Sequence, residues 1–508
     1  MSLDYLESEQ SVNKESKHNR TLRMKRNWLS IVLVVAVEAY CLRGGFGPYP
    51  LQAEDIVVSP DKQFNSIVPN ALYMLKKAKS DLGKGSSPLN GEEALERYGF
   101  TALQEACDAF AEGMGRPIPV KICEDTLATL NSLLFSHAEH NKNVQKHNIV
   151  LLMSESWGYY LSTLSSKNCQ LMPEMERHLH EDLLFDNFTS VRNGTARSLE
   201  CLTVATPFKG FFFSPHHYTT LPTSIAKAFC KSGYSTTFIT GMDPGWGNVQ
   251  EGLTVQGFDD IVAMYEMKSA HPEYKECCIG VYDHYMLNSL MEILEKPAKS
   301  PKFIMGLTTT NHPPLDLPDD IKLPELPDTL VNSRNFSGKR DVVRQYLRGF
   351  QYANQSIGNL LTRFKESPAA DNTIIIICGD HSLRSIIDYN NVDESFRNRI
   401  LMYVYLPPAL RQPHHKSATH KYGNHYDILP TLASFALNDV DYLHIGRDLL
   451  ADSSSVTECA YNEDALLCDE RQRARAERFT NAREALLNIY FDLFLKKNEL
   501  PYPRTHIL

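Results

Sequence analysis

The strongest constraint on the fold is an uninterrupted apolar run over residues 373–379, Thr-Ile-Ile-Ile-Ile-Cys-Gly, which is followed directly by Asp380 and His381. Such a run is typical of a strand buried on both faces of a parallel sheet. A second run of this kind, residues 148–154, ends at Glu155. Two carboxylates and an imidazole suit a hard or borderline divalent ion such as Mn²⁺, Mg²⁺ or Zn²⁺. We therefore predict that Glu155, Asp380 and His381 are ligands of one metal site.

Apolar runs alternate with helical patterns along the chain after residue 146. Strands are predicted over residues 148–154, 235–240, 302–308, 373–378 and 400–406. Residues 344–364 and 427–437 carry apolar side chains at helical spacing. This alternation predicts an α/β fold, with a mostly parallel central sheet and helices on both of its faces.

The size and charge of the chain limit its partners. Of its 508 residues, 43% are hydrophobic, enough for one large core or two ordinary ones. The net charge of −9 is modest, and no long basic stripe interleaves with aromatic residues, so nucleic acid is not an expected partner. Eleven cysteines are compatible with an oxidising compartment, where Cys459 and Cys468 are the pair best placed for a local disulfide.

An apolar stretch near the N-terminus, residues 28–42, follows a cluster of basic residues. These are Lys14, Lys17, Arg20, Arg23, Lys25 and Arg26. The arrangement predicts a membrane helix over residues 27–46, with the following chain outside the cytoplasm. The clean apolar portion is shorter than the roughly 20 residues of a full span, and Glu38 lies inside it. A cleaved signal peptide and a buried helix are the alternative interpretations.

A candidate nucleophile, Thr195, lies between the first and second predicted strands, directly after Gly194. We expect a helix to begin at this threonine. The N-terminus of a helix offers free N–H groups and the positive end of the helix dipole, which favour an alkoxide and a bound phosphate. A nearby metal ion would complete the activation of the hydroxyl.

In their order along the chain, Glu155, Thr195, Asp380 and His381 resemble the motifs of the alkaline phosphatase superfamily, specifically of its lipoteichoic acid synthase and phosphoglycerol transferase branch. The resemblance covers residues 43–450. Its further motifs are Arg43-Gly44-Gly45, Met153-Ser154-Glu155-Ser156, His420-Lys421-Tyr422-Gly423 and Asp427-Ile428-Leu429-Pro430-Thr431. It implies an alkaline phosphatase-like α/β/α sandwich, preceded by a membrane helix. The four residues would then bind one ion, Mn²⁺ in first place, and the threonine would attack the phosphodiester of a lipid headgroup.

The same resemblance indicates substrate-binding residues. His312, in an Asn-His context after the third predicted strand, would contact the phosphoryl group. Asp243 and Trp246 lie where headgroup-contacting residues are expected, although Trp246 could equally be a packing residue in a Pro-Gly turn. His420 would support the pocket or have a structural role. A histidine expected just after Thr240 is absent, which leaves the headgroup open.

The domain organisation follows from these assignments. The expected segments are a basic cytoplasmic tail (1–26), a transmembrane helix (27–46), a juxtamembrane helical linker (47–146), a sulfatase-like catalytic domain (147–454) and a C-terminal helical appendix (455–508). The catalytic domain would lie on the extracytoplasmic or periplasmic side of the cell (inner) membrane. The chain would be a single-span form or a truncated multi-span form of its family.

The function implied is transfer of a phosphoglycerol-type headgroup from a phospholipid to a glycan or lipid acceptor through a covalent phospho-threonine intermediate. A phosphoethanolamine transferase and a phosphodiesterase or sulfatase-like hydrolase are the alternatives within the superfamily. A sulfatase would need a Cys/Ser-x-Pro-x-Arg motif, which does not surround Thr195. The alternative from another class is a catalytically inactive, membrane-anchored binding protein.

Overall fold

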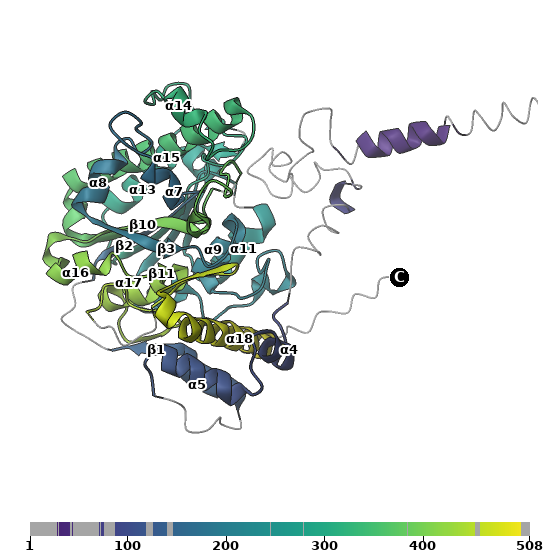
Figure 1. The fold of residues 1–508 in the computed structure, drawn as a ribbon, viewed down its shortest axis with the longest axis vertical. Coiled ribbons are helices and arrows are strands. Elements are labelled where there is room, and N and C mark those ends of the chain that lie inside the picture. Colours follow the sequence, from purple (N-terminus) through teal and green to yellow (C-terminus); the bar gives the residue numbers. More distant parts are fainter. Residues whose placement is uncertain are drawn as a thin grey trace, which may run out of the picture. The chain divides into compact units, whose positions relative to one another are not determined.

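The fold was obtained as a computed structural model (Figure 1), and it forms two compact units, Met1–Gly83 and Lys84–Leu508. The residues that the structure describes are 28, 30–40, 43, 71, 73–75, 87–117, 125–139, 146–243, 245–277, 279–383, 385–452 and 458–498. The predicted site residues all lie within the second unit.

In the first unit, residues 30–40 are helical, as are Trp28 and Arg43. The large apolar side chains that the structure describes between residues 28 and 40 are exposed, Ile31, Leu33 and Val35 among them. Among the described residues, no helix has the length and the apolar character needed to cross a membrane. The span predicted over residues 27–46 is thus not found in the described part, and the tail of residues 1–26 lies outside it.

The second unit is built around an eight-stranded sheet in the order β11-β3-β10-β9-β2-β8-β4-β5. The strands are β2 (Asn148–Ser154), β3 (Leu183–Thr189), β4 (Ser235–Thr240), β5 (Asp260–Val262), β8 (Lys302–Leu307), β9 (Thr373–Gly379), β10 (Arg399–Tyr405) and β11 (Gly423–Asn424). Only β10 runs antiparallel to its neighbours, β3 and β9; the other neighbouring pairs are parallel. The expectation of a mostly parallel sheet is confirmed.

The five predicted strands correspond to β2, β4, β8, β9 and β10. The sequence patterns do not predict β3, which leads to Thr195. Its sequence, Leu-Leu-Phe-Asp-Asn-Phe-Thr, is interrupted by Asp186 and Asn187, and its burial is likewise uneven. Because β3 lies between β10 and the short edge strand β11, part of it remains accessible and needs no continuous apolar run.

Alternate side chains of the central strands enter two separate hydrophobic cores. Ile374 and Ile376 belong to one core, and Ile375 and Ile377 belong to the other. This is the period of two expected of a strand covered on both faces. The first face carries α4 (Gly91–Arg97), α5 (Leu103–Gly113), α6 (Thr126–Leu134), α9 (Thr195–Val204), α10 (Ile225–Lys231), α11 (Val249–Val255), α17 (Ile428–Ala436) and α18 (Arg473–Lys497). The second carries α7 (Tyr159–Thr163), α8 (Met175–Glu181), α12 (Met264–Ala270), α13 (Asp283–Glu295), α14 (Asp328–Val331) and α15 (Arg340–Glu366).

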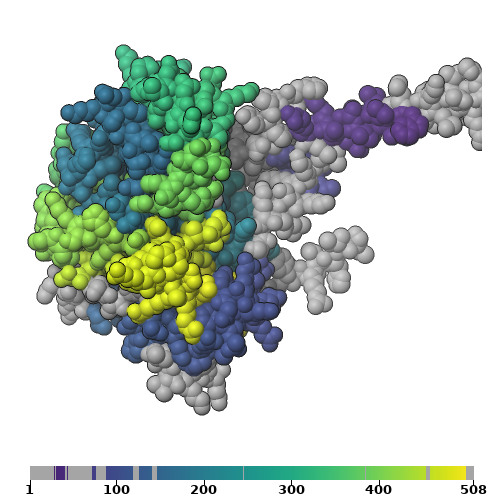
Figure 2. All heavy atoms as spheres, viewed as in Figure 1, coloured from purple at the N-terminus to yellow at the C-terminus, as the bar shows by residue number. Residues whose placement is uncertain are grey.

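Segments from both ends of the second unit pack together on the first face of the sheet. Phe110 of α5 stacks on Phe479 of α18, with ring centroids 5.8 Å apart. Strand β1 (Phe135–Ala138) pairs with β12 (Val440–Leu443). Figure 2 shows the yellow C-terminal segment lying against the dark blue segment that contains α5. Parts of the predicted linker and of the predicted appendix therefore share one core with the sheet, while the five segment boundaries stay predictions.

A hairpin of β13 (Ala460–Asn462) and β14 (Ala465–Leu467) precedes α18. Its strand register pairs Ala460 with Leu467, so Cys459 and Cys468 lie at opposite positions one residue further out. Both are buried thiols in the structure, and burial raises the pKa of the Cys459 thiol to about 11. The pair that the sequence places best for a local disulfide is therefore not bridged in this structure.

The close approach of β9 and β10 leads to a test of the site's framework. A Cβ atom at Gly379 would lie 2.6 Å from the carbonyl oxygen of Trp157 and 3.0 Å from Cβ of Ile400. We expect Gly379→Ala to lower the free energy of unfolding by about 1–3 kcal/mol, because the added methyl group would be overpacked against Trp157 and Ile400. Urea denaturation of the metal-free protein measures it. Gly91→Ala, where a Cβ meets nothing within 4 Å, is the control and should change stability by less than about 0.5 kcal/mol; equal effects would contradict the argument.

Candidate metal centre

The parallel register of β2 and β9 brings the two predicted carboxylates together. Ser154 lies opposite Gly379, so Glu155 and Asp380 leave neighbouring strands at the same level. The backbone N–H of Asp380 still donates to the carbonyl of Ser154, at 3.1 Å. Both side chains are buried, with 2% of Glu155 and 0% of Asp380 exposed. Two acidic groups are therefore held side by side without water around them.

Asp380 uses only one of its carboxylate oxygens for hydrogen bonds within the protein. Its Oδ1 accepts the backbone N–H groups of Ser156 (2.7 Å) and His381 (2.6 Å). Its Oδ2 is buried without a hydrogen-bond partner and lies 3.3 Å from Nε2 of His381. Burial, and next the charge of Glu155, raise the pKa of Asp380 to about 7. A buried carboxylate oxygen without a hydrogen-bond partner fits the role of a ligand to a cation.

His381 presents its Nε2 atom to the same point. Its Nδ1 lies 3.0 Å from the carbonyl oxygen of Ser382, which assigns the proton to Nδ1 and leaves Nε2 as a lone-pair donor. Nε2 lies 3.7 Å from Oε1 of Glu155. Ligand atoms of Glu155, Asp380 and His381 all lie within 4.8 Å of one another. The donor set fits one divalent ion, and the residues' roles as its ligands stay predictions.

Thr195 completes the cluster from β3 and α9. It is the first residue of α9, and its Oγ1 donates to Oε2 of Glu155 at 2.9 Å and lies 3.5 Å from Nε2 of His381. The preceding residue, Gly194, has φ = +102°, a conformation that other L-residues rarely adopt. The helix start expected from the sequence is confirmed, and the hydroxyl faces both carboxylate and imidazole.

Several residues that hold Glu155 in place were not identified from the sequence. The N–H of Glu155 donates to Oγ1 of Thr308 (3.0 Å), and Nδ2 of Asn311 donates to the carbonyl of Glu155 (3.0 Å). Asp283, at the start of α13, accepts the N–H groups of Thr309 and Thr310. Burial raises the pKa of Asp283 to about 6. The polar run Thr-Thr-Thr-Asn after an apolar strand was the available signal, since buried hydroxyls need partners.

Three of the predicted substrate residues, His312, Asp243 and Trp246, differ in their surroundings. His312 follows Asn311 at the edge of the cluster, is exposed, and has its Nδ1 2.7 Å from the carbonyl of Pro313. Trp246 packs edge-on against Phe213, with centroids 5.5 Å apart, and Oδ1 of Asp243 accepts the N–H of Gly245. These contacts favour the packing interpretation of Trp246 and show that Asp243 stabilises a turn, while the substrate-binding roles of both residues stay predictions.

His420, the fourth predicted substrate residue, contacts strand β3. Its Nδ1 lies 3.4 Å from Oδ2 of Asp186, its carbonyl accepts from Asn187, and its side chain is 76% exposed. These contacts favour the structural interpretation of His420. A different histidine supports the centre: His425 is buried, and its Nε2 lies 2.9 Å from the carbonyl of Gly379. Burial lowers the pKa of His425 to about 4, so it is neutral near pH 7.

A second group with metal-ligand chemistry, His178, Glu181 and Asp182, differs from the first. Lys365 lies 2.7 Å from Glu181 and 2.5 Å from Asp182, and Arg411 lies 3.0 Å from Asp182. Side-chain cations therefore already balance these carboxylates, and this group is not a comparable metal site.

The mixed, mostly parallel sheet with this cluster at the carboxyl edge of its strands is an alkaline phosphatase-like α/β fold. It resembles a protein of the alkaline phosphatase superfamily from Vibrio parahaemolyticus, with a TM-score of 0.55 and 21% identity over 78% of this chain and 99% of that one. It also resembles the lipoteichoic acid synthase LtaP from Listeria monocytogenes, with a TM-score of 0.53 and 17% identity over 73% and 97% of the two chains.

The family model described as Sulfatase matches residues 147–438, which is more than half of the chain. The chain therefore belongs to the sulfatase family. It is 23% identical to lipoteichoic acid synthase 1 of Bacillus subtilis (strain 168) over 67% of this chain and 54% of that protein. It is 25% identical to phosphoglycerol transferase I of Xanthomonas campestris pv. campestris (strain B100) over 44% and 30%. The chain thus spans about half the length, or less, of these curated relatives.

The geometry predicts that the purified protein binds one divalent ion. Asp380→Asn and Glu155→Gln should each weaken Mn²⁺ binding at least about 100-fold, because each removes a charged oxygen from a buried cluster. Titration calorimetry and metal content after dialysis measure this. His420→Ala is the matched control, since its exposed side chain contacts Asp186. Unchanged binding in Asp380→Asn, or an equal loss in His420→Ala, would contradict the assignment.

The raised pKa of Asp380 predicts how the metal-free protein responds to pH. An unfolded aspartate titrates near 4, whereas the folded protein holds this proton up to about pH 7. The folded state therefore binds more protons in this window, and its stability should fall as pH rises from about 4 to 7. Denaturant titrations of metal-free wild type and Asp380→Asn test this. The Asn variant should lack much of the slope; identical slopes would refute the prediction. Mn²⁺ affinity should rise over the same window.

Proposed function

We propose that this protein is a metal-dependent transferase that takes a phosphoglycerol-type headgroup from a phospholipid and passes it to a glycan or lipid acceptor. The observation that carries the proposal is the position of Thr195, whose hydroxyl lies 2.9 Å from Glu155 and 3.5 Å from His381 at the first residue of a ten-residue helix. A hydroxyl in this position can act as a nucleophile. The names of the relatives, lipoteichoic acid synthase and phosphoglycerol transferase, support the substrate class.

In the first step Oγ1 of Thr195 attacks the phosphorus of the donor phosphodiester. An Oγ1–P bond forms while the bond from phosphorus to the diacylglycerol oxygen breaks, and the departing oxygen takes up the proton that the hydroxyl of Thr195 loses. The hydroxyl proton of Thr195 points at Oε2 of Glu155, which orients the oxygen lone pairs away from that carboxylate. A divalent ion held by Glu155, Asp380 and His381 would supply Lewis-acid stabilisation and lower the pKa of the hydroxyl.

The protein also provides groups for the phosphoryl oxygens. The first N–H groups of α9 are not used within the helix and suit a phosphate. His312 directly follows Asn311, whose side chain donates to the carbonyl of Glu155, and its ring is exposed; we propose that it contacts a phosphoryl oxygen. In the second step the oxygen of an acceptor hydroxyl forms a bond to phosphorus, the bond from phosphorus to Oγ1 of Thr195 breaks, and Oγ1 takes up the proton that the acceptor hydroxyl loses.

Mn²⁺ is the ion we propose, with Mg²⁺ and Zn²⁺ as the alternatives, because carboxylate-rich sets with one imidazole suit all three.

We further propose that the N-terminal apolar stretch keeps the enzyme at the membrane that contains its donor, with the catalytic unit on the extracytoplasmic side. The basic residues before this stretch support that orientation. The exposed apolar side chains of residues 30–40 support contact with lipid.

Trapping the covalent intermediate tests the function and identifies the headgroup. The full chain in detergent is incubated with Mn²⁺ and either phosphatidylglycerol or phosphatidylethanolamine, and its mass is measured intact and after proteolysis. We expect a glycerophosphate adduct on Thr195 with the first lipid, and no adduct in Thr195→Ala. Turnover should fall roughly 1,000-fold or more in that variant, as when other nucleophiles are removed. Thr254→Ala, an exposed helical threonine in α11, is the control.

The other outcomes are equally informative. A phosphoethanolamine adduct on Thr195 would show that the transferred headgroup is phosphoethanolamine and would leave the proposed mechanism unchanged. Release of a phosphorylated headgroup into water without an acceptor would make the protein a hydrolase. If the protein binds metal but gives neither an adduct nor a released headgroup with either lipid, the proposal that it is an enzyme is overturned and a binding protein is favoured.

A further inference from the structure

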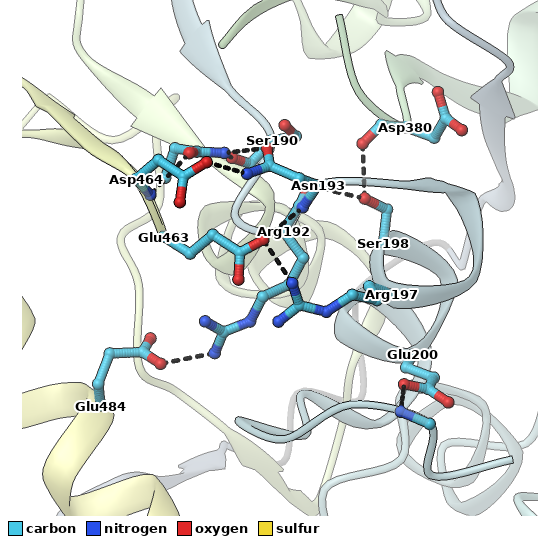
Figure 3. A network of polar contacts seen from close by, with 12 residues as sticks. Ser190, Arg192, Asn193, Arg197, Ser198, Glu200, Asp380, Glu463, Asp464 and Glu484 are labelled. Carbon is cyan, nitrogen blue, oxygen red and sulfur yellow. Dashed lines mark hydrogen bonds and ion pairs between the residues drawn. The ribbon is translucent and has the colours of Figure 1, made fainter. Parts of the chain in front are cut away.

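The loop that carries Thr195 is bound by a second element that the catalytic sheet does not include. This element is the hairpin of β13 and β14, whose turn consists of Glu463 and Asp464. Oε1 of Glu463 accepts the backbone N–H of Asn193 at 2.9 Å and Nη1 of Arg197 at 2.5 Å. One carboxylate thus holds the chain two residues before and two residues after the nucleophile. Figure 3 shows Glu463 with contacts to both.

Further contacts fix the same loop to the hairpin. Oδ2 of Asp464 accepts Nδ2 of Asn193 at 2.6 Å, and the N–H of Glu463 donates to the carbonyl of Val191 at 3.0 Å. Nδ2 of Asn462 donates to the carbonyl of Ser190 at 2.7 Å and to Oδ1 of Asn193 at 2.9 Å. Each residue of the hairpin turn and the one before it therefore bonds to the loop.

A buried ion pair anchors the loop to the helix that follows the hairpin. Nη2 of Arg192 lies 2.5 Å from Oε2 of Glu484 in α18, and both side chains are almost fully buried. Tyr426 bonds to both partners. From the side of the metal centre, Oγ of Ser198 donates to the carbonyl of Asp380 at 2.6 Å. The loop is thus held between the metal-ligand strand and the C-terminal segment (Figure 3).

We propose that Glu463 is a positioning residue for the nucleophile, acting with Asp464 from the C-terminal hairpin. Gly194 has φ = +102°, and no atom lies within 4 Å of the position that a Cβ would take. Because glycine is conformationally permissive and no neighbour packs against it on this side, the loop depends on contacts of its other residues to keep one geometry. Glu463 supplies that restraint on both sides of Thr195 without contacting the metal ligands. Its loss lets Oγ1 of Thr195 leave the attack position. This inference rests on the proposed function, since it gives the C-terminal segment a role in that same site.

The test compares Glu463→Ala and Glu463→Gln with wild type in the full chain with Mn²⁺. The substrate is bis(4-nitrophenyl) phosphate, a generic phosphodiester. We expect kcat to fall about 10- to 100-fold in Glu463→Ala with KM changed less than about threefold, because misplacement of about 1 Å at a reacting group has an effect of this size. Glu463→Gln keeps an oxygen for the N–H of Asn193 and should recover part of the loss. Mn²⁺ affinity should fall much less than kcat, because Glu155, Asp380 and His381 keep their positions.

The matched control is Glu470→Gln, which removes an exposed carboxylate paired with Arg473 in the same C-terminal segment. It should leave kcat, KM and Mn²⁺ affinity at wild-type values. A loss of kcat in this control equal to that in Glu463→Ala would show a general effect of destabilising the segment and would overturn the proposal. Unchanged kcat in Glu463→Ala would overturn it as well.

Hydrogen exchange separates this inference from the proposed function. Amide exchange in the peptide covering residues 190–198 should speed up in Glu463→Ala and stay at the wild-type rate in Glu470→Gln, whether or not the protein turns over any phosphodiester. If wild type shows neither turnover nor a Thr195 adduct, the proposed function fails and exchange alone decides the positioning role. Unchanged exchange in Glu463→Ala would overturn the positioning role, even if the transferase is active.

Discussion

The site depends on the pairing of two parallel strands, β2 and β9, in one register. Because Ser154 lies opposite Gly379, the next residue of each strand is an acidic one, and the two carboxylates emerge next to each other inside the protein. In the metal-free protein, burial in the first place and the neighbouring charge of Glu155 in the second raise the pKa of Asp380. A divalent cation would remove the repulsion between the two carboxylates and use the carboxylate oxygen that has no hydrogen-bond partner.

Hydrogen bonds from neighbouring residues hold both members of this pair in position despite the repulsion. Thr308 and Asn311 bind the backbone of Glu155, and the N–H groups of Ser156 and His381 bind Oδ1 of Asp380. Ser156, whose N–H donates to Asp380, has φ = +51°, an uncommon conformation outside glycine. A non-glycine residue in this region is found at functional sites, where the surrounding structure compels it. The rigidity of the centre is therefore distributed over several loops at one edge of the sheet.

Much of the fold could be predicted from the sequence, because buried parallel strands have an obvious signature. The runs ending at Ser154, Thr240 and Gly379 correspond to β2, β4 and β9. Strand β3 was missed because it is only partly covered and contains Asp186 and Asn187. Glu155, Thr195, Asp380 and His381 could be proposed from the sequence because they stand just after a predicted strand or at an expected helix start, and the structure brings them together. The hairpin of Glu463 and Asp464 was missed because short charged turns look the same whether they face solvent or another loop.

The sequence by itself determined which residues are chemically able to form the centre, and in which kind of fold, because residue type and the period of apolar side chains depend only on local order along the chain. Only the tertiary structure decided that Glu155 and Asp380 share one level of the sheet. It also decided that His420 lies against Asp186, and that the C-terminal hairpin holds the loop of Thr195. These contacts join residues far apart in the chain, over 200 positions in each of the three, and strand register and side-chain packing set them rather than any local pattern.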